Sequence, residues 1–249
     1  MARGAHRDPL GQPLLTRSSR HLACTPAGER VLAHARRILD VLAELEAIAI
    51  AADDELLIGF AWAALGEHTV TVQRGWADDG SGKLVFVQSD TPTAGLLEGR
   101  CAVAVLRRTI ADPRIERAEV GHERRYAVVA TDHHLASRST VCLADLVDDT
   151  VAVDDQSGTT TASLWEPDRR PAGFRTTHGI DEGLTVIASG QAIGISSEAT
   201  LAQFPRPGVV FRLVQDAPPI TVWLGWRRDD PPPSLEALLD LTRRSLAPD

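Results

Sequence analysis

The chain has 249 residues, of which 43% are hydrophobic and 24% are charged, a composition typical of globular proteins that excludes extended disorder. Its formal net charge is −8. Since DNA-binding domains are usually basic, this charge excludes a nucleic-acid-binding surface that involves most of the chain. The charge is uneven, since residues 1–37 hold seven arginines against Asp8 and Glu29. A basic N-terminal segment therefore precedes an acidic remainder of the chain.

The sequence predicts neither export nor membrane insertion. Residues 1–10 are polar and basic and lack the apolar core of a signal peptide. No apolar run approaches the roughly 18 residues that a membrane helix needs. Cys24, Cys101 and Cys142 are odd in number and widely spaced, which favours buried reduced thiols over a disulfide framework or a zinc site. We expect a cytoplasmic protein with no membrane partner.

Two short strands and a long helix are predicted first along the chain. Residues 14–25 hold apolar positions on both sides of a basic turn, which indicates a small wing. Thr25 is a candidate N-cap and Pro26 fits the first helical position, while Glu29 favours the positive end of the helix dipole. The helix then runs without glycine or proline to about residue 50.

Apolar residues follow the helix in alternating steps of three and four, the pattern of a coiled-coil seam. The seam consists of Gly28, Val31, Ala35, Ile38, Leu42, Leu45 and Ala49. The alternative is an amphipathic helix packed on its own domain. The length of the helix, roughly 37 Å at 1.5 Å per residue, favours pairing with a second copy. We expect dimerisation through Val31, Ile38, Leu42 and Leu45.

Strands and helices alternate over the remainder of the chain, which predicts α/β structure with a parallel sheet. Two strand–helix–strand units are indicated, one before residue 131 and one after. The predicted strands are residues 55–60, 83–88, 101–106, 115–120, 125–131, 150–153, 174–177, 192–195, 209–214 and 220–227. The predicted helices are residues 65–76, 91–98, 181–189 and 234–245, with a helical turn at 143–145.

Several segments together resemble the LysR family of bacterial transcription regulators. They are LGQPLLTR at residues 10–17, Arg20, CTPAGE at 24–29, DHHLA at 132–136, GQAIGI at 190–195, and the strand at 221–227 followed by a C-terminal helix. Each motif is weak alone, but their order and spacing are fairly specific. The resemblance covers residues 10–249, with apolar Leu15 and Cys24 at positions where the family often has Phe and Leu.

The resemblance implies a wing remnant, a linker helix and two α/β subdomains of the periplasmic-binding-protein type II kind. The implied division is 1–24 for the wing remnant of a winged helix-turn-helix, 25–52 for the linker and dimerisation helix, 53–124 with 228–249 for the first subdomain, and 125–227 for the second. The strands at 125–131 and 220–227 would cross between the subdomains. A small effector would bind in the cleft between them.

The segment before the wing departs from the family pattern. About fifty residues with two helices and a recognition helix normally precede the wing, and that helix enters the major groove. Here thirteen residues precede it, and residues 1–9 lack helical apolar spacing. We expect Arg17 and Arg20 to contact the DNA backbone, which positions a protein without specifying sequence. The alternative for both arginines is a solvated turn.

Candidate effector contacts lie at strand ends. Backbone N–H groups at a helix start can hold a carboxylate, although residues 61–64 lack the Ser or Thr that the resemblance implies. An arginine can pair with a carboxylate through two parallel hydrogen bonds, so we expect an anionic effector. The candidates are Trp62, Ala63, Asp90, Thr91, Arg107, Gln156, Ser157, Thr159 and Ser196. The alternatives are packing for Trp62, an N-cap for Asp90 or Thr91, and a surface charge for Arg107.

Motifs for metal binding and catalysis were also considered. His133 and His134 are adjacent and have no third ligand at a suitable spacing, which favours a loop role over a metal site. The sequence has no Gly-x-Ser-x-Gly, P-loop or His-Glu-x-x-His motif and no full dinucleotide fingerprint. We expect an effector-sensing, dimerising regulator that is not an enzyme and takes no cofactor. The alternatives are a dimerisation partner or small-molecule-binding protein without DNA binding, a transport binding protein, and an enzyme on the same fold.

Overall fold

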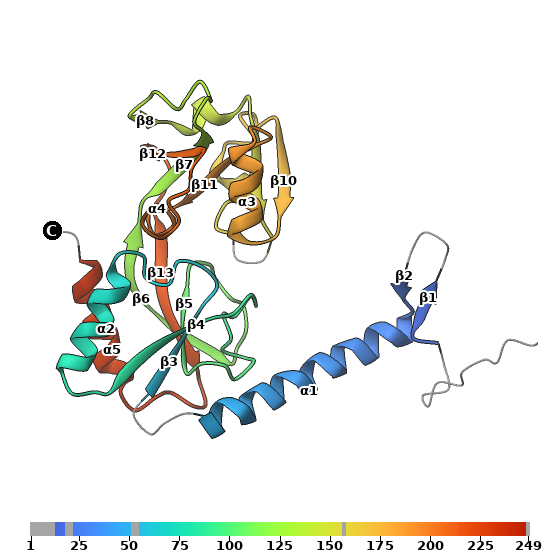
Figure 1. Ribbon diagram of the computed structural model, residues 1–249, viewed down its shortest axis with the longest axis vertical. Helices are drawn as coiled ribbons and strands as arrows, with labels where there is room; N and C mark the ends of the chain where they lie inside the picture. Colours follow the sequence, from blue (N-terminus) through green and yellow to red (C-terminus); the bar gives the residue numbers. More distant parts are fainter. Residues whose placement is uncertain (1–12, 18–21, 51–54, 156–157, 248–249) are drawn as a thin grey trace, which may run out of the picture. The chain divides into compact units, whose positions relative to one another are not determined.

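The computed structural model describes residues 13–17, 22–50, 55–155 and 158–247 (Figure 1). The chain divides into two compact units, Met1–Ile50 and Ala51–Asp249. Each unit is described by itself. No helix in the described part of the chain is long and apolar enough to cross a bilayer.

The first unit is a two-stranded hairpin followed by a long helix, as predicted. Strands β1 (Leu15–Arg17) and β2 (Leu22–Cys24) pair antiparallel. Helix α1 (Pro26–Ile50) begins where the capping signal placed it. The N–H of Gly28 donates to Thr25 Oγ1 at 2.9 Å, and this bond satisfies one of the free amides of the first turn.

Gly28 allows the start of the helix to pack closely against the hairpin. A Cβ at this position would lie 2.0 Å from the carbonyl oxygen of Leu14 and 3.3 Å from the Cβ of Cys24. Only glycine permits so close an approach of two backbones. Gly28, predicted as part of the pairing seam, is therefore buried against its own hairpin.

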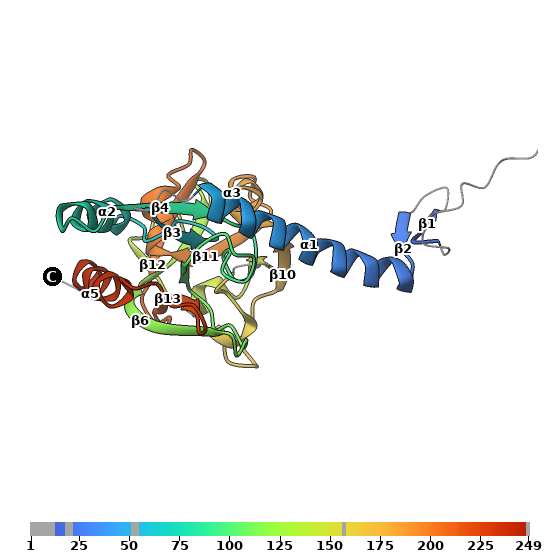
Figure 2. The ribbon, with the colours of Figure 1, turned by 90° about the horizontal axis from the view of Figure 1, so that it is seen from below.

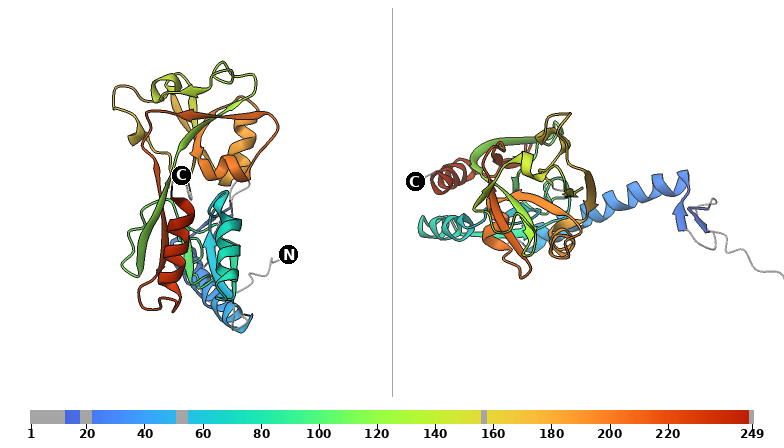
Figure 3. Two further views of the ribbon diagram at one scale, coloured as in Figure 1. Left: turned by 90° about the vertical axis from the view of Figure 1, so that its left-hand side faces the viewer. Right: turned by 90° about the horizontal axis from the view of Figure 1, so that it is seen from above.

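The second unit contains a five-stranded sheet, which defines subdomain I. Its strand order is β4-β3-β5-β13-β6. Strand β3 runs parallel to β4 and β5, whereas β13 runs antiparallel to β5 and β6. The strands are β3 (Glu55–Phe60), β4 (Lys83–Gln88), β5 (Val103–Leu106), β6 (Ile115–Glu123) and β13 (Ile220–Arg227). Helices α2 (His68–Asp78) and α5 (Leu235–Leu246) lie side by side against this sheet (Figures 2 and 3).

A six-stranded sheet defines subdomain II. Its strand order is β10-β9-β11-β7-β12-β8, with β7 antiparallel to both of its neighbours. The strands are β7 (Arg125–Ala130), β8 (Thr140–Val141), β9 (Thr150–Asp154), β10 (Gly173–Thr177), β11 (Ile193–Ser197) and β12 (Val209–Val214). The helices are α3 (Gly179–Ala188), α4 (Glu198–Gln203) and two 3₁₀ turns, η1 (Leu143–Leu146) and η2 (Ala162–Leu164). Both sheets are thus mixed, where the alternation predicted a parallel one.

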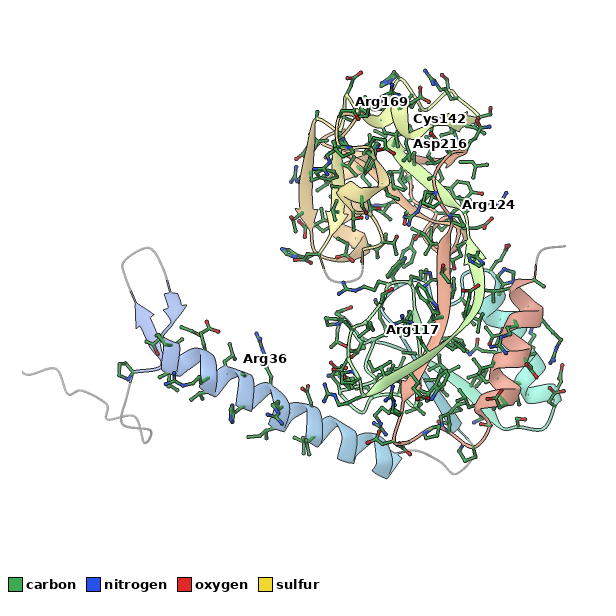
Figure 4. The ribbon with its side chains drawn as sticks, turned by 180° about the vertical axis from the view of Figure 1, so that it is seen from behind. Arg36, Arg117, Arg124, Cys142, Arg169 and Asp216 are labelled. Carbon is green, nitrogen blue, oxygen red and sulfur yellow. The ribbon has the colours of Figure 1, made fainter. Side chains whose placement is uncertain are left out.

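Each subdomain has its own hydrophobic core. Trp76 of α2, Leu224 of β13 and Leu238 of α5 are buried together in subdomain I. Leu146 of η1 and Ile193 of β11 belong to a separate cluster in subdomain II. The chain passes between the two sheets at Arg124, between β6 and β7 (Figure 4), and again between β12 and β13. Strand β13, predicted as a crossover within the second subdomain, is hydrogen-bonded along its length into the sheet of subdomain I.

Three element predictions need correction. Residues 91–98 form successive turns, because Ala94 (φ 53°) and Gly95 (φ 90°) take left-handed conformations that a helix cannot include. Helix α2 begins at His68 and not at residue 65, because positive φ values precede it. Helix α4 was not predicted, although Ser197 and Glu198 form an ordinary helix-start pattern. The strands at 55–60, 83–88, 209–214 and 220–227 are confirmed.

Candidate functional site

A cavity of about 380 Å³ lies between the two subdomains of the second unit. Subdomain I lines it with residues at or just after the ends of β3 and β4, namely Ala61, Trp62, Gln88, Asp90 and Thr91. Subdomain II contributes residues of its strands, of the loops after them and of α3, including Asp154, Thr159, Thr160, Thr177, His178, Asp181, Leu184, Ile187, Ile195 and Ser196. The size is that of an ordinary small-molecule site. Trp62, Asp90, Thr91, Thr159 and Ser196, predicted from sequence, thus come together.

Trp62 connects the walls of the cavity. Its indole N–H donates to Thr200 Oγ1 of α4 at 3.1 Å, and Ser196 Oγ donates to the same hydroxyl at 2.8 Å. A side chain of subdomain I is thereby hydrogen-bonded to a buried residue of subdomain II. A buried tryptophan normally finds such a partner for its N–H. Trp62 is thus both part of the cavity wall and a bridge between the subdomains.

Arg107 does not line the cavity, which corrects its predicted role as a ligand contact. Its side chain is 1% exposed and pairs with Glu123, with Nε and Nη2 donating to the two carboxylate oxygens at 2.9 and 2.7 Å. This is the two-bond pairing expected of an arginine with a carboxylate, but the carboxylate belongs to the protein. The guanidinium also stacks on the Trp62 ring, 5.2 Å from its centroid.

The same guanidinium holds the backbone of the loop after β3. It donates to the carbonyl oxygens of Trp62 at 3.3 Å and Ala64 at 2.7 Å. Ala63 and Ala64 have φ angles of 55° and 37°, in the left-handed region that non-glycine residues rarely adopt. Ala63 is fully buried and does not line the cavity, so its predicted contact with an effector is not seen. The loop is strained, and Arg107 keeps it in place.

Hydroxyl groups are numerous in the cavity, but several have already donated their proton. Thr91 Oγ1 donates to Glu98 Oε2 at 3.0 Å, and Thr160 Oγ1 donates to the carbonyl of Ile195 at 2.8 Å. Thr159 Oγ1 accepts a bond from Arg125 at 3.4 Å. A hydroxyl has one proton and two lone pairs. Thr91 and Thr160 can therefore offer a ligand only acceptor capacity.

The start of α3 forms a part of the wall that sequence reasoning missed. The N–H of Gly179 donates to Asp154 Oδ1 at 3.1 Å, and the N–H of His178 donates to Glu182 Oε2 at 3.0 Å. His178 Nδ1 lies 2.9 Å from Asp155 Oδ2, and this hydrogen bond and charge raise the pKa of the exposed imidazole. The signal that could have found this wall is the convergence of β9 and β10 on one helix start, where ligands bind in such sheets.

Some predicted site residues cannot be placed. Gln156, Ser157 and Arg20 lie outside the described residues, as do the side chains of Arg17 and Leu45. Their roles stay predictions.

Helix α1 exposes the predicted seam. Ile38 is 69% exposed, Leu42 is 50% exposed and Val31 is 38% exposed. Leu39 and Val41 are also exposed. Exposed apolar side chains in a row are unusual on a surface that faces only water. They are available to a partner, and the predicted pairing stays a prediction.

A third possible ligand lies beside the two histidines. His133, His134 and Asp149 place one ligand atom each within 4.8 Å of one another. The expectation that no third group accompanies the histidine pair was therefore wrong. His133 Nε2 already contacts Asp149 Oδ1 at 3.1 Å, and its Nδ1 accepts the N–H of Leu135 at 3.3 Å. These bonds give His133 a structural role in its loop.

The second unit is a two-lobed α/β domain with a small-molecule cavity between its lobes, and the first unit places a hairpin and a long helix before it. Comparison with known proteins identifies the family. The family model described as the LysR substrate binding domain matches residues 83–247. The chain belongs to the LysR family.

Two curated relatives are transcriptional regulators of Escherichia coli strain K12. The Hca operon transcriptional activator HcaR is 25% identical over 257 residues, covering 96% of this chain and 84% of HcaR. The uncharacterized HTH-type transcriptional regulator YnfL is 31% identical over 145 residues, covering 55% of this chain and 49% of YnfL. The match therefore spans about half the length of YnfL.

Solved structures show the same fold at lower identity. CbnR, a LysR family transcriptional regulator, aligns with a TM-score of 0.67 at 20% identity, covering 90% of this chain and 82% of CbnR. The BenM effector binding domain with its effector benzoate aligns with a TM-score of 0.65 at 17% identity, covering 80% of this chain and 97% of that domain. The predicted two-subdomain fold is thus confirmed.

Proposed function

We propose that this chain senses a small-molecule effector in the cavity between its two subdomains and regulates transcription in response. The observation that carries the proposal is the cavity itself, whose walls come from both subdomains. A ligand that touches both walls favours one relative arrangement of the lobes over others. Such differential contact is what allows a ligand to shift a conformational equilibrium.

Contacts beside the crossing points support a transmission route. Glu123, at the end of β6, holds Arg107, which in turn holds the loop of Trp62. Arg124, the next residue, forms an ion pair with Glu198 at the start of α4 (Figure 4). The wall of the cavity is thereby connected to the point where the chain crosses between the sheets. A displacement of Trp62 would therefore change the contacts of Glu123 and Arg124, where the chain crosses between the sheets.

The first unit would supply dimerisation and DNA contact. We propose that α1 pairs with the same helix of a second copy through Val31, Ile38, Leu42 and Leu45, giving a homodimer or a tetramer. Burying a Leu or Ile side chain stabilises an interface by about 1.5–3 kcal/mol. The hairpin would place Arg17 and Arg20 against DNA phosphates, with the bases read by the family's helix-turn-helix. The implied divisions at residues 24, 52 and 124 belong to this proposal, whereas β13 (Ile220–Arg227) lies in the sheet of subdomain I.

Ligand screening with a cavity-blocking variant tests the proposal. The purified full chain is screened by thermal denaturation against a metabolite library, since a ligand that binds only the folded state raises its melting temperature. Ser196→Trp fills the cavity, and Ser81→Trp, at an exposed loop outside it, is the matched control. We expect hits that stabilise the wild type and the control but not the blocked variant. Hits that stabilise all three proteins equally, or no hits at all, would contradict the proposal.

A further inference from the structure

We propose that the effector of this cavity is a small organic cation, an amine with an apolar body, and not the anion expected from sequence. The inference rests on the proposed function, because it concerns the ligand of the same cavity. It follows from the charges of the wall, from the direction of its hydrogen bonds and from the self-capped start of α3.

The charges of the wall are mainly negative. Asp90, Asp154 and Asp181 line the cavity, and no lysine or arginine is found among its lining residues within the described part of the chain. His178 is the one lining side chain there that can become positive, and Asp155 already pairs with it. Asp181 is 93% exposed and pairs with Arg206, so Asp90 and Asp154 are the charges that a ligand would meet. A carboxylate would meet two like charges and an ammonium group two opposite ones, a difference that grows as water leaves the site.

Of the neighbouring arginines, Arg107 and Arg206 are paired with carboxylates, and Arg125 is held by carbonyl oxygens. Arg107 is neutralised by Glu123 behind the loop of Trp62. Arg125 donates from Nε to the carbonyl oxygen of Pro218 at 2.8 Å and from Nη1 to the carbonyl oxygen of Thr159 at 3.2 Å. Arg206 lies 3.8 Å from Asp181 and donates to backbone and hydroxyl oxygens of α3. None of the three is among the lining residues.

Three of the five hydroxyl groups that the described residues place in the wall are left as acceptors for a ligand. Thr91, Thr160 and Ser196 donate their hydroxyl protons to Glu98, Ile195 and Thr200 within the protein. The indole N–H of Trp62 is also used, on Thr200. What these groups still present is lone pairs. A ligand that donates several hydrogen bonds matches such a wall, and an ammonium ion has donors and no acceptor.

The helix start that would normally attract an anion is already occupied. The first amides of α3 point toward its N-terminal end, where a carboxylate or phosphate is usually stabilised. Here Asp154 accepts the N–H of Gly179, the first residue of α3, and Glu182 accepts the N–H of His178, the residue before it. The protein thus supplies its own anion at this position. A ligand carboxylate would have to displace Asp154 or lie beside it.

The apolar part of the wall defines the body of the ligand. Trp62 lines the cavity together with the apolar side chains of α3 and β11, namely Ile180, Leu184, Ile187 and Ile195. A volume of about 380 Å³ accommodates an aromatic or branched aliphatic group with one or two amines. Asp90 belongs to subdomain I and Asp154 to subdomain II. An amine between them would attract both subdomains at once, which gives the cation a direct means of closing the cleft.

Matched pairs of opposite charge test the inference on the full chain. Benzylamine is compared with benzoate, butylamine with butyrate, and butanediamine with succinate, at equal ionic strength, by calorimetric titration and thermal denaturation. We expect each amine to bind at least about tenfold more tightly than its carboxylate partner, the ratio that one charge-assisted hydrogen bond supplies. Tighter binding of the carboxylates would overturn the inference and leave the proposed function standing. Binding by no member of the panel would overturn both.

Charge-removing variants locate the effect in the cavity. Asp90→Asn and Asp154→Asn each remove one negative charge, and the asparagine oxygen at 154 can still accept the N–H of Gly179. Each variant should weaken amine binding about tenfold and should not weaken carboxylate binding. Asp148→Asn, an exposed position of subdomain II outside the cavity, removes the same charge as a control. An equal loss in all three variants would overturn the assignment of the cation to this cavity.

Discussion

Replacing Arg107 by methionine should destabilise the second unit severely. The variant leaves the carboxylate of Glu123, whose side chain is 9% exposed, without its partner in an apolar setting. It also removes the donors to the carbonyl oxygens of Trp62 and Ala64. Breaking a buried ion pair by removing one partner costs about 3–5 kcal/mol. For a unit of this size, each kcal/mol lowers the melting temperature by about 2–4 °C. The expected decrease is therefore about 6–20 °C.

Two further variants separate the missing charge from the missing packing. In the double variant Arg107→Met with Glu123→Leu no buried charge is left unpaired, and such replacements are often neutral. It should therefore recover most of the lost stability. Arg117→Met is the matched control, because Arg117 is exposed and stacks on the ring of Trp223 (Figure 4). Thermal and urea denaturation measure all four proteins. A loss below about 1 kcal/mol in Arg107→Met, or no recovery in the double variant, would refute the reasoning.

Three other predictions follow from single features. Ile38→Asp combined with Leu42→Asp should weaken dimers at least about a hundredfold, and an unchanged mass by light scattering would contradict the pairing of α1. Burial raises the pKa of the Cys101 thiol to about 12, so at pH 8 iodoacetamide should label it in urea but hardly in the native protein, as followed by mass spectrometry. The Asp155 carboxylate raises the pKa of His178 above its ordinary 6.5. Their ion pair should therefore be fully formed at mildly acidic pH, where the carboxylate is ionised and the imidazole is protonated, and should weaken as the pH rises through that raised value. An NMR titration of His178 should show a midpoint that Asp155→Asn lowers.

The elements that the sequence predicted correctly are those whose signal is local. Thr25 and Pro26 mark the start of α1, and the apolar runs at 55–60 and 209–214 mark β3 and β12. The segment at 91–98 carries an equally good helix signal, yet it forms turns. A Cβ on Gly59 would lie 1.9 Å from the carbonyl oxygen of Ala94, so this segment is pressed onto the backbone of β3. Such a tertiary contact overrides the local helix propensity, and it cannot be predicted from the sequence of the segment alone.

The sequence predicted several loops of the candidate site, but it did not predict the partner of Arg107. Trp62 and Asp90 follow strands and Ser196 lies near the end of one, and the carboxyl ends of strands meet at the cleft, so position alone located them. Arg107 also follows a strand, but the direction of its side chain depends on Glu123, sixteen residues later. A sequence shows that two opposite charges exist and not whether they face each other. The expected anionic effector rested on this arginine and on backbone N–H groups at residues 61–64, and the buried pair removes the contribution of the arginine.

In the proposed function, the contacts of Trp62 would carry the effect of a ligand beyond the cavity. Trp62 contacts the cavity, lies against the guanidinium of Arg107 and donates to Thr200 of the other subdomain. A ligand that shifts its ring must change at least one of the other two contacts, each worth about 0.5–1.5 kcal/mol. Couplings between sites in proteins are typically 1–3 kcal/mol. The contacts of this one side chain are thus large enough to carry a signal from the cavity to the crossing at Glu123 and Arg124. These contact energies are also small enough for the change to reverse when the ligand leaves.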